Sequence, residues 1–196
     1  MYQHSSKKIL TAVYNTAGSV LTSKGKHTTI NELTDQIPAV RPEVLYAALD
    51  ILLHIWPLPE EATVVLSEED KGAILAGMFS AGADLPLAMA RHNVTYRIPG
   101  AIQVPLSMEY MDGRLEIHGV KPGDQVVLID DTLASGGTMV ALINAIREAG
   151  ATVCDIRVVV EKLGYGGREK VATVTDLYIH AGLGINVSET GVVSVP

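Results

Sequence analysis

Apolar residues recur along the chain at two different spacings. Apolar positions three and four residues apart predict helices, and short runs of Val, Ile and Leu predict strands. The expected helices are residues 5–21, 41–55, 71–83 and 139–149. The expected strands are residues 63–66, 85–90, 126–129, 152–160 and 174–179. Because strands alternate with helices over much of the chain, the pattern predicts an α/β protein with a mainly parallel sheet.

Other segments lack a clear period. Residues 92–106 contain two prolines and a glycine, which predicts a long loop. Residues 108–117 are folded about Asp112-Gly113, which is typical of a β-hairpin. The chain is expected to form a single domain, with an N-terminal helical segment over residues 1–59 and a core over residues 60–196.

Composition excludes several classes of protein. The 196 residues carry a formal net charge of −7, which disfavours a surface for nucleic acid or an anionic membrane. The single Cys154 excludes an internal disulfide and a cysteine-based zinc site. The chain shows no signal peptide, and no apolar run reaches the roughly 18 residues that a membrane span needs. We expect a soluble, cytoplasmic protein.

One strand ends in two acids and is followed by a loop of small residues and a helix. Residues 126–129 are Val-Val-Leu-Ile, Asp130 and Asp131 follow, and residues 134–138 are Ala-Ser-Gly-Gly-Thr. Backbone N–H groups of such a loop can approach a phosphate closely, and the start of the helix adds partial positive charge. The carboxylates can accept hydrogen bonds from sugar hydroxyls or bind a divalent cation. The segment therefore predicts a sugar-phosphate site.

Three interpretations of this segment differ in their fit. A Walker-type P-loop is excluded because Gly-x-x-x-x-Gly-Lys-Ser/Thr is absent and the loop contains no lysine. A phosphoacceptor aspartate pair does not have the following Gly-Gly-Thr. Residues 130–138, Asp-Asp-Thr-Leu-Ala-Ser-Gly-Gly-Thr, resemble at every position the phosphoribosyl-pyrophosphate motif of the type I phosphoribosyltransferases.

The resemblance extends over about residues 60–195. Residues 67–72, Ser-Glu-Glu-Asp-Lys-Gly, are similar to the pyrophosphate-binding loop of this family, and Ala90-Arg91-His92 is similar to its Ala-Arg-Lys. Glu109-Tyr110 resembles part of the hairpin of adenine enzymes, and Glu161-Lys162 resembles the tail of xanthine enzymes. The resemblance implies the type I phosphoribosyltransferase fold, a central mainly parallel sheet flanked by helices with a small hood.

The resemblance also implies a reaction and roles for individual residues. A 5-phosphoribosyl group would pass from phosphoribosyl pyrophosphate to a purine base, with Mg²⁺ bridging pyrophosphate and ribose. Asp130 and Asp131 would accept hydrogen bonds from the ribose hydroxyls and organise the metal. Glu109 would handle a proton or contact the sugar. The 5′-phosphate would bind to Ala134, Ser135, Gly136, Gly137 and Thr138. The cations expected to bind pyrophosphate are Lys71, Arg91 and Arg97.

The identity of the base stays open at this point. Lys162 stands where enzymes acting on 6-oxopurines place a donor to the exocyclic oxygen, which favours xanthine, hypoxanthine or guanine. Ala134 stands where hypoxanthine-guanine enzymes place an Asp, which favours the adenine and xanthine branch. Thr34 replaces the Asn of xanthine enzymes.

Two other functions remain as alternatives. Some proteins of this fold sense phosphoribosyl pyrophosphate and control transcription, and such a protein would need a basic N-terminal module. The lysines available there are Lys7, Lys8, Lys24 and Lys26. The chain could also act on an unusual base, because specificity lies in the hood and loops. The resemblance implies a homodimer.

Overall fold

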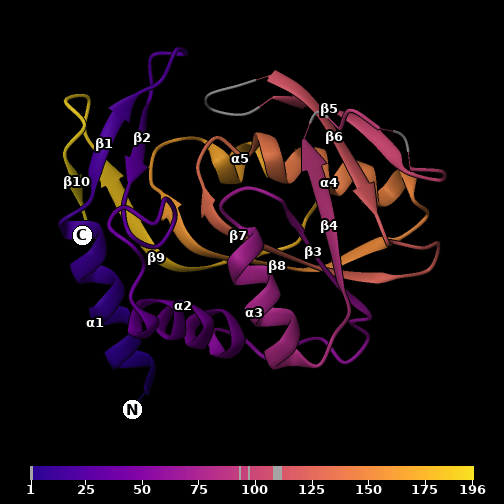
Figure 1. Cartoon of the computed structure of the whole chain (residues 1–196), viewed down its shortest axis with the longest axis horizontal. Helices are drawn as coiled ribbons and strands as arrows, with labels where there is room; N and C mark the ends of the chain where they lie inside the picture. The colour runs from indigo at the N-terminus through magenta and orange to yellow at the C-terminus, as the bar shows by residue number, and fades with distance from the viewer. Residues whose placement is uncertain (1, 93, 97, 108–111) are drawn as a thin grey trace.

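The computed structural model describes residues 2–92, 94–96, 98–107 and 112–196, and consists of helices packed on both faces of one large sheet (Figure 1). The helices are α1 (Tyr2–Asn15), α2 (Pro42–His54), α3 (Ala73–Ala83), α4 (Gly137–Glu148) and α5 (Gly167–Val171). The strands are β1 (Gly18–Leu21), β2 (His27–Ile30), β3 (Val64–Glu68), β4 (Leu87–His92), β5 (Ile102–Ser107), β6 (Asp112–His118), β7 (Gln125–Leu133), β8 (Thr152–Lys162), β9 (Ile179–Val187) and β10 (Val193–Ser194).

The large sheet is mixed but mainly parallel. Its strand order is β10-β9-β8-β7-β3-β4-β6-β5. The five strands from β9 to β4 run parallel, and β10, β6 and β5 are antiparallel additions at the two edges. This arrangement confirms the predicted α/β class. It also brings the carboxyl ends of β3, β7 and β8 to one edge of the sheet.

Two hydrophobic clusters cover the two faces of the sheet. Val126 and Leu128 of β7 belong to the cluster under α4, whereas Val127 and Ile129 belong to the cluster that contains α1, α2 and α3. Side chains alternate between the faces of a strand, so a strand buried on both faces must be apolar throughout. This explains the unbroken apolar run that precedes Asp130.

A separate hairpin, β1–β2, forms the hood over one end of the sheet. Figure 1 shows it beside β9 and β10. Ser19 Oγ donates a hydrogen bond of 2.7 Å to the carbonyl oxygen of Gly191, which connects the hairpin to the turn before β10. The hood hairpin is therefore attached to a segment near the C-terminus. The expected boundary near residue 60 falls between α2 and β3.

The helices predicted at residues 41–55, 71–83 and 139–149 are confirmed, whereas the helix expected over residues 5–21 is too long. Helix α1 ends at Asn15, and residues 18–21 form strand β1. Val20 and Leu21 continue the apolar spacing of the helix, but they are 50% and 65% exposed in the hairpin. The spacing of these two residues therefore matched a helix by coincidence, because neither side chain is buried. No helix within the described ranges combines the length and apolar character needed to cross a membrane.

Three further predictions at the strands need correction. Part of the loop expected over residues 92–106 is strand β5, an edge strand in which Pro105 is tolerated because one side of an edge strand has no partner. Ser107 pairs with Asp112, and Asp112 and Gly113 belong to strand β6, so the turn expected at Asp112-Gly113 is wrong. The strand expected over residues 174–179 begins only at Ile179.

A buried arginine of strand β8 connects this strand to the end of helix α2 through hydrogen bonds. Arg157 is fully buried, and its Nε donates a 2.6 Å hydrogen bond to Asp155 Oδ2. Its Nη1 and Nη2 donate to the carbonyl oxygens of Leu52 at 2.7 Å and Pro57 at 2.9 Å. The carbonyl of Leu52 lies in the last turn of α2, where carbonyls have no partner within the helix, and Pro57 follows the helix. The guanidinium therefore stabilises the end of α2 and the carboxylate of Asp155 together.

We predict that Arg157→Ala lowers the free energy of unfolding by about 3–5 kcal/mol, because it leaves a buried carboxylate and helix-end carbonyls without their donor. Urea unfolding followed by circular dichroism measures this loss. Lys8→Ala, at an exposed position of α1, serves as the control and should change stability by less than about 0.5 kcal/mol. A loss of equal size in both variants would contradict the role of Arg157.

Candidate active site

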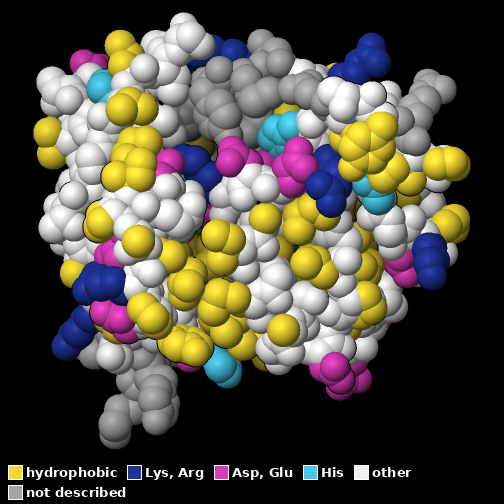
Figure 2. Space-filling model, in the orientation of Figure 1, with side chains coloured by type: hydrophobic (Ala, Val, Ile, Leu, Met, Phe, Trp, Pro, Cys, Tyr) yellow, Lys and Arg dark blue, Asp and Glu magenta, His cyan; other side chains and the backbone are white. Residues whose placement is uncertain are grey.

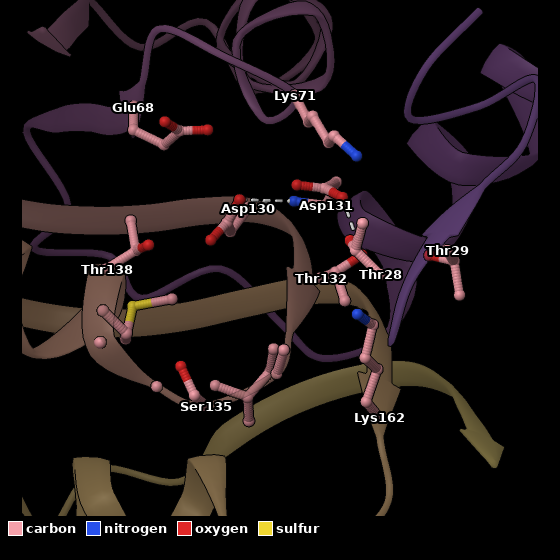
Figure 3. A pocket seen from close by; sticks show the side chains of 15 residues that line it. Thr28, Thr29, Glu68, Lys71, Asp130, Asp131, Thr132, Ser135, Thr138 and Lys162 are labelled. Carbon is pink, nitrogen blue, oxygen red and sulfur yellow. Dashed lines mark hydrogen bonds between the residues drawn. The ribbon is translucent and has the colours of Figure 1, made fainter. Parts of the chain in front are cut away.

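A pocket opens at the carboxyl edge of the sheet, between the hood and the loop after β7. Figure 2 shows acidic and basic side chains gathered in the upper part of one face of the molecule, where β3 and β4 end, above a largely hydrophobic area. Figure 3 shows the side chains that point into the pocket. The lining residues are Thr28, Thr29, Glu68, Lys71, Asp130, Asp131, Thr132, Leu133, Ala134, Ser135, Gly136, Gly137, Thr138, Met139 and Lys162.

The two acids that end β7 are buried next to each other. Asp130 and Asp131 are each 6% exposed. The backbone N–H of Asp131 donates to Asp130 Oδ1 at 2.8 Å, and Thr132 Oγ1 donates to Asp131 Oδ2 at 2.7 Å. Burial raises the pKa of Asp130 well above its ordinary value, and the charges of Asp131 and Glu68 raise it further.

The second acid has a different balance of effects. Burial also raises the pKa of Asp131, but hydrogen bonds from Thr132 and Asp130 and the positive charge of Lys71 lower it. Ionising both of two adjacent buried carboxyl groups costs much free energy unless a cation is close to them. The pair therefore favours positive charge and hydroxyl donors in the pocket.

The loop after the acids turns sharply into helix α4. Gly136 has φ 74°, in the left-handed region, and a Cβ there would lie 2.7 Å from the carbonyl oxygen of Gly167. Glycine is thus required both for the backbone angle and for the close approach to α5. Helix α4 begins at Gly137, and its first N–H groups have no partner within the helix. All five predicted phosphate-loop residues line the pocket, in a geometry suited to an anion.

The segment between β3 and α3 closes the pocket on another side. Lys71 points into it, and its Nζ lies 2.6 Å from Asp35 Oδ1. The next residue is Gly72, where a Cβ would lie 2.6 Å from Ser67 Oγ and 2.9 Å from Asp130 Oδ1. Only glycine therefore lets this segment pack directly on Asp130.

Lys162 brings a second cation to the pocket from the end of β8. It is 3% exposed, and its Nζ donates to the carbonyl oxygen of His27 at 3.4 Å. The Nζ also lies 5.2 Å from the centre of the Tyr165 ring, within the range of a cation–π interaction. Tyr165 donates from its hydroxyl to the same carbonyl at 3.2 Å. The hood hairpin therefore contacts Lys162 directly.

The remaining predicted site residues do not line this pocket or lie outside the described residues. Arg91, on β4, is not among the lining residues, and its Nη1 lies 3.2 Å from Oε2 of Glu69. Arg97 and Glu109 lie outside the described residues. Beside Arg91, His92 Nε2 lies 2.6 Å from Glu68 Oε2, and the hydrogen bond with Glu68 raises the pKa of His92.

Sequence reasoning gave no role to several residues of the pocket. Glu68 had two signals, its place in the segment that resembles a pyrophosphate loop and its position at the end of a strand, but it was assigned no role of its own. Thr28 and Thr29 come from the hood, which the pattern predicted poorly. Asp35 reaches the pocket only through its ion pair with Lys71.

Residues 34–186 match the family described as the phosphoribosyl transferase domain, which is more than three quarters of the chain. The chain belongs to this family, which confirms the resemblance. Relatives named hypoxanthine/guanine phosphoribosyltransferase include those of two Methanocaldococcus species. That of Methanocaldococcus jannaschii is 36% identical, over 69% of this chain and 73% of the relative. That of Methanocaldococcus infernus is 35% identical, over 84% and 87%.

Solved structures share the fold. The adenine phosphoribosyltransferase of Thermoanaerobacter pseudethanolicus superposes with a TM-score of 0.75 at 18% identity, covering 91% of this chain and 99% of that one. The adenine phosphoribosyltransferase of Trypanosoma brucei gives 0.75 at 20% identity, covering 94% and 80%. At this identity the likeness concerns the fold alone.

We predict that Asp130→Asn raises the free energy of unfolding at about pH 8 by on the order of 2 kcal/mol, because it removes a buried charge beside two other carboxylates. The amide oxygen still accepts the hydrogen bond from the N–H of Asp131. The pKa of Asp130 is higher in the folded than in the unfolded chain, so the penalty grows as the pH rises above the unfolded pKa and is complete above the folded pKa. It disappears as the pH falls toward the ordinary value near 4.

Urea unfolding at about pH 8 and about pH 5 tests this sign. The difference between variant and wild type should shrink at the lower pH. Asp84→Asn is the matched control, since Asp84 is exposed and adopts a left-handed conformation that Asn also tolerates. The explanation is wrong if Asp130→Asn is no more stable than wild type at pH 8.

Proposed function

We propose that the protein transfers a 5-phosphoribosyl group from phosphoribosyl pyrophosphate to a 6-oxopurine base and releases pyrophosphate. The observation that carries this proposal is that the buried acids Asp130 and Asp131, the loop 134–138 and two lysines line the same pocket. In Figure 3, Lys71 lies above Asp131 and Thr132, and Lys162 lies below them. Phosphoribosyl pyrophosphate carries a 5′-phosphate, two free ribose hydroxyls and a pyrophosphate group, and these groups need an anion-binding loop, acceptors and cations.

The sugar and its 5′-phosphate bind at the β7 end and the following loop. Backbone N–H groups of residues 134–138 donate to the phosphate, and the hydroxyls of Ser135 and Thr138 add donors. Asp130 and Asp131 accept hydrogen bonds from the 2′- and 3′-hydroxyls. The ribose is thereby fixed while its C1 develops positive charge, and a nitrogen of the base forms a bond to C1 as the bond to pyrophosphate breaks.

The acid pair fits a Mg²⁺ ion that is shared with the substrate. In the part of the chain that the structure describes, no group of three His, Cys, Asp or Glu side chains could hold a metal ion by itself. Mg²⁺ is typically bound by one or two carboxylates together with substrate phosphates, which matches Asp130 and Asp131 beside a phosphate loop. When bound, Mg²⁺ neutralises charge on the departing pyrophosphate.

The pyrophosphate end lies toward Lys71. Its ammonium is a mobile point charge that suits a phosphate oxygen. Arg91, Arg97 and Glu109 remain part of the proposal from the family resemblance alone. Arg91 would reach substrate by leaving Glu69, with which it now pairs.

The base end lies toward Lys162. An ammonium group can donate three hydrogen bonds, and a 6-oxopurine offers a carbonyl oxygen where adenine has an amino group. A cation buried to 3% exposure strengthens such a bond, because the surroundings screen it little. The names of the relatives that act on hypoxanthine and guanine support the same choice of base.

The test is a panel of hypoxanthine, guanine, xanthine and adenine, each with phosphoribosyl pyrophosphate and Mg²⁺, with release of pyrophosphate and formation of the nucleotide measured. We expect turnover with at least one 6-oxopurine, and loss of turnover when EDTA removes the metal. Lys162→Met should lower kcat/KM for the 6-oxopurine by about 100-fold, equivalent to a charge-assisted hydrogen bond of about 3 kcal/mol.

Lys170→Met, on the exposed surface of α5, is the matched control and should retain wild-type kinetics. A preference for adenine that Lys162→Met leaves unchanged would overturn the choice of base. Binding of phosphoribosyl pyrophosphate without turnover of any base would favour the alternative of a sensor protein. We also propose a homodimer from the family resemblance, which sedimentation equilibrium tests by a mass twice that of the chain.

A further inference from the structure

The proposed pyrophosphate lysine is already paired with an acid of this chain. Lys71 Nζ lies 2.6 Å from Asp35 Oδ1, and the two side chains are 23% and 11% exposed. At this distance and partial burial, water screens the ion pair less than it screens one on an open surface. An incoming phosphate group must therefore compete with Asp35 for the same ammonium.

The local backbone fixes Asp35 in this position. Its second oxygen, Oδ2, accepts hydrogen bonds from the backbone N–H of Asn31 at 3.1 Å and from Thr34 Oγ1 at 2.6 Å. The next residue, Gln36, has φ 54°, a left-handed conformation that is uncommon outside glycine. The turn thus presents one carboxylate oxygen to Lys71 and keeps the other for itself.

Lys71 lies between two acids that differ in their role. Its charge lowers the pKa of Asp131 on one side, and its ammonium contacts Asp35 on the other. Asp131 belongs to the acid pair proposed for ribose and metal. Asp35 does not line the pocket, but its partner Lys71 does. Because Lys71 contacts Oδ1 and the turn bonds to Oδ2, the loss of Lys71 would leave the hydrogen bonds of the turn to Asp35 intact.

We propose that Asp35 is a positioning residue that occupies Lys71 in the ligand-free enzyme, in place of the substrate's pyrophosphate group, and that substrate binding displaces it. This proposal rests on the proposed function. It makes Asp35 a residue that weakens pyrophosphate binding and so promotes product release. The turn that carries Asp35 directly follows β2, whose Thr28 and Thr29 line the same pocket. The exchange at Lys71 therefore takes place at the base of the hood.

The test uses Asp35→Asn and measures the binding of inorganic pyrophosphate in excess Mg²⁺ by isothermal titration calorimetry. The amide oxygen can still accept from Asn31 and Thr34, so the turn is retained, while Lys71 loses its counter-charge. We expect pyrophosphate to bind about 3- to 10-fold more tightly than to wild type. A residue needed only for folding would give weaker binding, so the sign of the change separates the two roles.

A double-mutant cycle with Lys71→Met shows whether the effect passes through Lys71. In the Lys71→Met background, Asp35→Asn should leave pyrophosphate affinity unchanged within a factor of two. Asp35→Glu, which keeps the charge, should bind pyrophosphate more weakly than Asp35→Asn. An equal gain with and without Lys71 would mean that Asp35 acts only as a distant negative charge, which contradicts the exchange.

The wild-type titration separates this proposal from the proposed function. If wild-type protein binds neither pyrophosphate nor phosphoribosyl pyrophosphate with Mg²⁺, the proposed function fails. If wild type binds both and Asp35→Asn binds pyrophosphate equally or more weakly, the exchange at Lys71 is wrong while the function stands. Far-ultraviolet circular dichroism and thermal unfolding of each variant confirm that the protein is folded.

Discussion

The burial of two adjacent carboxyl groups at the end of β7 is the constraint on which the site depends. Asp130 and Asp131 are nearly inaccessible, and Glu68 adds a third carboxylate to the same pocket. Such a cluster is unfavourable for folding, which is why the pKa values of both aspartates are raised. Under the proposed function, a cation and sugar hydroxyls would offset this cost. The acid pair then lowers the stability of the ligand-free protein in favour of substrate binding.

The positive groups around this cluster are positioned by other parts of the chain. Asp35 contacts Lys71, and the carbonyl oxygen of His27 accepts from Lys162. Both partners come from the hood or the turn below it. The fold therefore connects Lys71 and Lys162, the proposed pyrophosphate and base ends of the pocket, through one N-terminal segment. Strand β7 and the start of α4 form the proposed phosphate and ribose site between them.

The features that sequence predicted are local ones. The acid pair, the glycine loop and helix α4 follow each other within one segment, and all were found in place. Strand β5 was missed because Pro105 argued for a loop, and only its edge position makes the proline acceptable. The contact between Lys162 and His27 joins residues 135 positions apart, so no spacing in the sequence could indicate it. Lys71 was predicted to bind pyrophosphate. Its ion pair with Asp35 could not be predicted, because the tertiary fold brings the two residues together.

The most direct test of the central claim is calorimetric titration of phosphoribosyl pyrophosphate, with and without Mg²⁺, into wild type and the double variant Asp130→Asn/Asp131→Asn. If the acid pair of β7 binds ribose and metal, wild type should bind far more tightly with Mg²⁺. The folded double variant should lose that Mg²⁺ dependence and bind at least tenfold more weakly, a difference of about 1.4 kcal/mol or more. Equal, Mg²⁺-dependent binding by both proteins would contradict the account.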